Sequence, residues 1–141
     1  MLKILIICTG NSCRSQMAEG WIRKLTDHSL IIHSAGTNPE PVNPSAIKVM
    51  QMASIDISKH KSNHIDDYVN IHFDYVITVC DNACKISSNL YIKGKAIHRS
   101  FPDPAKAKGT QKQIDLVYLK VRDMIEEFAK EFVFDELGFI D

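Results

Sequence analysis

Continuous apolar runs alternate along this chain with segments in which apolar residues recur every three or four positions. A continuous run is typical of a strand buried on both faces of a parallel sheet, whereas spacing of three or four is typical of a helix with one buried face. The predicted strands are LKILIIC (2–8), LIIHSAG (30–36), FDYVITVC (73–80) and the weaker AIHRSF (96–101). The predicted helices begin at Ser15, after Asn43 and after Thr110.

Two of these helices have recognisable starts. Asn43 precedes Pro44, and asparagine is a preferred cap while proline is tolerated at the first helical position. Thr110 is the best candidate for the cap of the last helix, whose expected buried face is Ile114, Val117, Val121, Ile125, Phe128 and Phe132. The segment 133–141 has no periodicity, so we expect a loosely attached tail.

Strands that alternate with helices predict an α/β three-layer sandwich, with a four-stranded parallel sheet and helices on both faces. Residues 1–141 are expected to form one domain, because 141 residues with 45% apolar content are enough for a single core. Ligands bind at the carboxyl ends of the strands in such folds. Cys8, Cys80 and the loop that carries Asp103 all fall at such ends.

The composition excludes some classes of function. Lysine plus arginine number 17 and aspartate plus glutamate number 17, so the chain has no basic surplus for nucleic acid or acidic membranes. We find no signal peptide or membrane-spanning run and expect a cytoplasmic protein, a monomer, with no tightly bound cofactor. Its four cysteines are then expected to serve catalysis or metal binding rather than structural disulfides.

The sequence CTGNSCRS (8–15) links the first strand to the first helix. Backbone N–H groups that point inward here, at a helix N-terminus, can hold a tetrahedral oxyanion, and the Arg14 guanidinium can bind two of its oxygens. We expect this positive field to lower the pKa of the Cys8 thiol and Ser15 to donate a hydrogen bond to the resulting thiolate. The oxyanion would be held by Thr9, Gly10, Asn11, Ser12, Cys13 and Arg14.

The loop CTGNSCRSQMAEG resembles the phosphate-binding loop of the low-molecular-weight protein tyrosine phosphatase superfamily, and most closely its arsenate reductase branch. SAG (34–36), VNP (42–44), IDIS (55–58), FDYVITVCDNA and SFPDPAKAKG match as well. The resemblance implies that Asp103 is a general acid and that Asn11 braces the loop. It also makes Asn11, Glu19 and Ser34 weak candidates for a potassium site, where Asn63 replaces an expected aspartate.

Two features separate the reductase from the phosphatase branch. Phosphatases of the family carry aromatic residues after Asp-Pro, whereas Ala105, Lys106 and Ala107 follow here. Cys80 matches the thiol that attacks the first cysteine during arsenate reduction, a step that phosphate-ester hydrolysis does not need. We therefore expect arsenate reduction, with a phosphatase that acts on phosphotyrosine or small aryl phosphates as the alternative.

The remaining cysteines leave alternatives open. Cys84 is the expected third thiol of the relay, although the family's usual position for it is taken by Ser87. Thioredoxin is the expected reductant, with glutathione and glutaredoxin as the other possibility. Cys13 is expected to be a small side chain under the turn, or a partner for a protective disulfide with Cys8. A zinc site and a non-catalytic oxyanion sensor are the rival classes of function.

Overall fold

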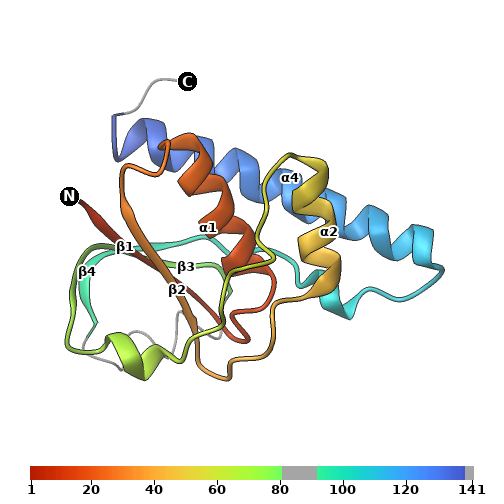
Figure 1. Ribbon diagram of the computed structural model, residues 1–141, viewed down its shortest axis with the longest axis horizontal. Helices are drawn as coiled ribbons and strands as arrows, with labels where there is room; N and C mark the ends of the chain where they lie inside the picture. Colours follow the sequence, from red (N-terminus) through yellow and green to blue (C-terminus); the bar gives the residue numbers. More distant parts are fainter. Residues whose placement is uncertain (81–91, 139–141) are drawn as a thin grey trace.

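Four parallel strands form the centre of the computed structural model, which describes residues 1–80 and 92–138 (Figure 1). The sheet order is β2-β1-β3-β4, so β1 is flanked by β2 and β3. The strands are β1 (Lys3–Cys8), β2 (Ile31–Gly36), β3 (His72–Thr78) and β4 (Lys93–His98). The predicted four-stranded parallel sheet, and with it the fold class, is confirmed.

Three α-helices pack against one another beside this sheet (Figure 1). They are α1 (Arg14–Leu25), α2 (Pro44–Met52) and α4 (Gln111–Asp135). Ser34 of β2 faces α1, where its hydroxyl donates to Glu19 at 2.6 Å. The adjacent His33 therefore faces the other side of the sheet. There it lies 5.1 Å, between ring centroids, from Tyr68 of the 3-10 helix η1 (Ile65–Tyr68).

Both predicted helix caps are confirmed. The side chain of Asn43 accepts hydrogen bonds from the N–H groups of Ser45 and Ala46, and Pro44 is the first residue of α2. Thr110 forms a capping box with Gln113 at the start of α4. Each cap satisfies N–H groups that the helix itself leaves without partners.

Three details differ from the sequence prediction. The fourth strand is Lys93–His98 rather than 96–101, because its exposed edge position removes the apolar signal. Val117 is 37% exposed, while the neighbouring Tyr118 is buried in its place. The tail expected from 133 is wrong at its start, because α4 continues to Asp135 and buries Val133.

The carboxyl ends of β1 and β3 meet where the loop to α1 begins. Cys8 is the last residue of β1, and Cys80 follows β3, so the parallel pairing of these strands brings the two cysteines to one edge of the sheet. The chain after β4 returns to the same edge and leads to η2 (Pro104–Lys106), which Asp103 caps. Across the described ranges, the helices are all too short or too polar to cross a membrane.

Candidate active site

The loop from Cys8 to Arg14 has its backbone carbonyls turned outward. A segment comprising residues 38–43 runs beside it and supplies three donors: Asn38 N–H to the Thr9 carbonyl at 2.9 Å, Glu40 N–H to Gly10 at 2.8 Å, and Asn43 N–H to Ser12 at 2.8 Å. In a trans peptide the carbonyl and the following N–H point in opposite directions. The N–H groups that follow these carbonyls are therefore directed to the inner side of the loop.

The other loop carbonyls are held in the same way. The carbonyl of Asn11 accepts from the Gln16 side-chain amide at 2.9 Å and from the Ser62 hydroxyl at 2.8 Å. The carbonyl of Cys13 accepts from the Met17 N–H at 2.9 Å. The ring of inward N–H groups surrounds a cavity of about 180 Å³ lined by Cys8, Thr9, Gly10, Ser12, Cys13, Arg14, Asn38, Glu40, Asp103 and Ala105. This arrangement suits a small tetrahedral anion.

Asn11 braces the loop, as predicted. It is fully buried and has a left-handed φ of 47°, a conformation that asparagine tolerates better than most residues. Its side-chain amide donates to the Ser15 hydroxyl at 2.9 Å, and its amide oxygen accepts from the Asn63 N–H at 2.8 Å. These bonds connect the turn to α1 and to the segment before η1.

Gly36 lets the loop lie directly against the end of β2. A Cβ at this position would lie 2.5 Å from the Thr9 carbonyl oxygen and 2.8 Å from the Asn11 nitrogen. Both neighbours are backbone atoms that cannot rotate away. Glycine is thus required by close approach of the loop backbone.

Arg14 reaches from the start of α1 to the loop that follows β4. Its Nη1 donates to the Phe101 carbonyl at 3.1 Å, and its Nη2 lies 3.7 Å from the Asp103 carboxylate. Its Nε is buried and makes no hydrogen bond to the described residues. A buried donor without a partner in the protein is available for a bound anion.

Asp103 lies at the mouth of the same cavity. One carboxylate oxygen accepts from the Ala105 N–H at 3.0 Å, and the other faces Arg14. The structure therefore brings together the predicted nucleophile and cation, from the two ends of one loop, and the predicted acid, from a second loop. The described residues that line the cavity include no aromatic side chain.

Cys8 and Cys80 are buried side by side, 3% and 4% exposed. A hydrogen bond between the two thiols, together with burial, raises the pKa of Cys8 above its ordinary value, while Arg14 and the Ser15 N–H lower it. The Thr9 hydroxyl lies 3.3 Å from the Cys80 sulfur. The prediction of a lowered Cys8 pKa is wrong for this state, because the neighbouring thiol and the buried setting outweigh the guanidinium.

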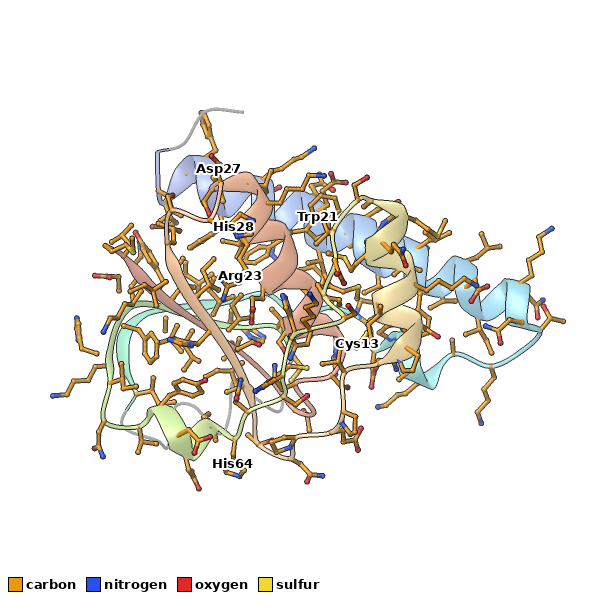
Figure 2. The ribbon with its side chains drawn as sticks, viewed as in Figure 1. Cys13, Trp21, Arg23, Asp27, His28 and His64 are labelled. Carbon is orange, nitrogen blue, oxygen red and sulfur yellow. The ribbon has the colours of Figure 1, made fainter. Side chains whose placement is uncertain are left out.

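Ser15 and Cys13 are the two other loop residues for which the sequence predicts a role beside Cys8. Ser15 contacts Cys8 through its backbone N–H, whereas its hydroxyl accepts from Asn11. Cys13 is buried, and burial with the nearby Asp103 raises the pKa of its thiol to about 12. Cys13 is thus a neutral, small side chain that lines the cavity, at the N-terminal end of α1 (Figure 2).

The candidate potassium residues already have protein partners. The carboxylate of Glu19 accepts from Ser34 at 2.6 Å and from the Arg23 Nε at 3.0 Å. Arg23 also donates to a backbone carbonyl of β2, and Figure 2 shows it beside that strand. Because the guanidinium balances the Glu19 charge, these residues do not fit a potassium ion, and we assign it no role.

Sequence reasoning missed Gln16 and the segment 38–43. Gln16 is fully buried, and besides the Asn11 carbonyl it contacts His60, whose Nδ1 donates to its amide oxygen at 3.0 Å. Gln16 is a polar residue in the first turn of α1 whose neighbours are also buried, which only the structure shows. Cys84, the predicted third thiol, lies outside the described residues.

The chain is similar in sequence to known proteins along most of its length. The family described as low molecular weight phosphotyrosine protein phosphatase matches residues 3–138. The arsenate reductase of Halalkalibacterium halodurans is 41% identical over 129 residues, which cover 92% of this chain and 93% of that protein. The arsenate reductase of Bacillus subtilis is 40% identical over 129 residues, with the same coverage of 92% and 93%.

Solved structures match over nearly the whole chain. An arsenate reductase in its reduced state has a TM-score of 0.76 and 28% identity, covering 96% of this chain and 98% of its own. The tyrosine phosphatase Wzb from Escherichia coli K30, in complex with sulphate, has a TM-score of 0.82 and 24% identity, covering 98% and 100%. The second likeness is one of fold alone.

Proposed function

The chain belongs to the low-molecular-weight phosphotyrosine protein phosphatase family, and within that family we propose that it reduces arsenate to arsenite by means of cysteine thiols. The observation that carries this proposal is a second buried thiol, Cys80, close enough to Cys8 to raise its pKa, while Cys8 itself lines the oxyanion cavity. Ester hydrolysis needs the first thiol alone. Reduction needs both, since two electrons must reach arsenic.

In the first step the Cys8 sulfur, as a thiolate, attacks arsenic. A sulfur–arsenic bond forms and an arsenic–oxygen bond breaks. The departing hydroxyl takes a proton from Asp103 and leaves as water. The inward N–H groups of the loop and the Arg14 guanidinium hold the remaining oxygens and stabilise their charge.

In the second step Cys80 attacks the Cys8 sulfur. A disulfide forms between them, the sulfur–arsenic bond breaks, and its electron pair stays on arsenic, which leaves as arsenite. The two thiols are oxidised together by two electrons, and arsenic is reduced by two. The Thr9 hydroxyl beside Cys80 can donate to its thiolate before the attack.

The disulfide must be reduced before another turnover. We propose that Cys84 attacks Cys80, which frees Cys8 and leaves a Cys80–Cys84 disulfide for an external dithiol. Thioredoxin is the proposed donor, and glutathione with glutaredoxin is the alternative.

A phosphatase that acts on phosphotyrosine or aryl phosphates is the second candidate. Cys8, Arg14 and Asp103 at one small cavity would serve it equally well, and the Wzb relative is a tyrosine phosphatase. Against it, within the part of the chain that the structure describes, no aromatic side chain lines this cavity to hold a phenyl ring. The absence of such a wall favours a bare inorganic oxyanion.

The Cys80→Ser variant separates the two functions. It keeps the nucleophile, the guanidinium and the acid but removes the second thiol. We expect arsenate turnover, followed as arsenite production with excess thioredoxin and its reductase, to fall at least a hundredfold. Hydrolysis of p-nitrophenyl phosphate should persist at the wild-type level or above. Arsenate turnover that survives in Cys80→Ser would refute the relay, and Cys8→Ser, which should lose both activities, is the control.

A further inference from the structure

In the segment 38–43, which we call the strap, residues that donate a backbone N–H alternate with prolines. Asn38, Glu40 and Asn43 donate their N–H groups to loop carbonyls, while Pro39 and Pro41 between them have no N–H to offer. Proline also fixes its own φ and keeps the preceding residue extended. The strap is therefore stiff, and its backbone donors are placed at intervals that match the carbonyls of the loop.

Both ends of the strap are anchored to regular structure. Upstream it continues from Gly36, the last residue of β2, against which the loop packs. Downstream Asn43 caps α2 and also donates from its side chain to the Tyr118 hydroxyl of α4 at 3.1 Å. In the middle, the Ser62 hydroxyl bonds to the carbonyls of both Glu40 and Asn11, which ties the strap and the loop to a third segment.

We propose that the strap presets the oxyanion loop, and that Asn38 and Glu40 are positioning residues that act through their backbone N–H groups. Each hydrogen bond fixes the rotation of one loop peptide, with its carbonyl outward and the next N–H inward. Without the strap, those peptides could rotate to hydrate their N–H groups. The substrate would then have to supply the ordering free energy on binding. This inference rests on the proposed oxyanion site, and it holds whichever reaction follows binding.

The chain allows this role to be tested by deleting one N–H group. Glu40 lies between two prolines, so its backbone is already confined to the extended region that a proline accepts. Glu40→Pro removes the N–H that binds the Gly10 carbonyl. Glu40→Ala removes the same carboxylate but keeps the N–H, and the comparison of these two variants isolates the backbone hydrogen bond.

Inorganic phosphate, titrated by calorimetry into the reduced full chain, is the first probe. We expect Glu40→Ala to bind phosphate at least as tightly as the wild type, because an acidic side chain has left the cavity mouth. Glu40→Pro should bind about tenfold more weakly than Glu40→Ala, as the loss of one orienting hydrogen bond implies. A second pair, Asn38→Pro and Asn38→Ala, repeats the comparison at the Thr9 carbonyl, and thermal unfolding checks that each variant folds.

A second readout distinguishes positioning from a general loss of structure. The pH dependence of Cys8 alkylation, followed by peptide mass spectrometry, should move to higher pH in Glu40→Pro but not in Glu40→Ala, because inward N–H groups stabilise the thiolate. Equal phosphate affinity and equal alkylation profiles in both proline–alanine pairs would overturn the role of the strap while leaving the oxyanion site intact. A wild-type protein that binds no phosphate would overturn the site itself, and the inference with it.

Discussion

Cys8 must lose its proton before it can attack, and the structure indicates what opposes that loss. The hydrogen bond with Cys80 is the largest cause that raises its pKa, followed by burial, while Arg14 acts in the opposite direction. A bound oxyanion would add hydrogen-bond acceptors and would compete for Arg14. The two thiols therefore titrate as a coupled pair, in which Cys80 opposes the loss of the proton from Cys8.

The effect of Cys80 predicts that removing its thiol lowers the pKa of Cys8 by a measurable amount. In Cys80→Ser the largest cause of the raised pKa is gone, and a hydroxyl can only donate to the thiolate. The pKa of Cys8 should fall, so alkylation of Cys8 by iodoacetamide should begin at lower pH than in the wild type.

The Cys13→Ser variant is the matched control, since Cys13 is not among the causes that shift the pKa of Cys8. Its Cys8 alkylation profile should stay at the wild-type position. An unchanged profile in Cys80→Ser would contradict the claim that Cys80 raises the pKa of Cys8.

At the scale of elements, Gly36 at the end of β2 has no side chain, and this lets the catalytic loop pack directly against the strand. Gly36→Ala should lower the free energy of unfolding by about 1–3 kcal/mol, because its Cβ meets backbone atoms of the loop at 2.5 and 2.8 Å. Phosphate binding should weaken as well, since the loop must shift. Urea denaturation measures the first effect and calorimetry the second.

Gly10→Ala is the comparison for that experiment. Its added Cβ would meet side-chain atoms, the nearest being the Ser12 hydroxyl at 3.3 Å, and these can move. The stability loss should be clearly smaller than for Gly36→Ala. Equal losses would show that close backbone approach is not what Gly36 provides.

Local sequence signals predicted much of the framework. The helix caps at Asn43 and Thr110 can be recognised from a few neighbouring residues. The continuous apolar run LKILIIC indicates a strand buried on both faces. These elements could therefore be predicted without any long-range information. The edge strand β4 was misplaced because its polar, exposed residues carry no such signal. The strap was missed because its hydrogen bonds join residues about thirty positions apart, and backbone donors leave no trace in side-chain chemistry.

At the scale of the whole molecule, the fold brings three distant loops to one edge of the sheet. The motif CTGNSCRS and the resemblance it carries predicted Cys8, Arg14 and Asp103, and the structure gathers them at one cavity. The raised Cys8 pKa could not be read from the motif, because it depends on Cys80, which lies 72 positions away and reaches Cys8 only through the pairing of β1 with β3.

The central claim, a reduction carried by a relay of thiols, predicts a specific product in the protein itself. The most direct measurement is a disulfide map of the fully reduced chain after one equivalent of arsenate, made by thiol blocking and peptide mass spectrometry. We predict one arsenate-dependent disulfide, Cys80 with Cys84, and a free Cys8, formed together with one equivalent of arsenite. A Cys8–Cys80 disulfide would keep the reductase and exclude Cys84 from the relay, whereas no arsenate-dependent disulfide at all would contradict the account.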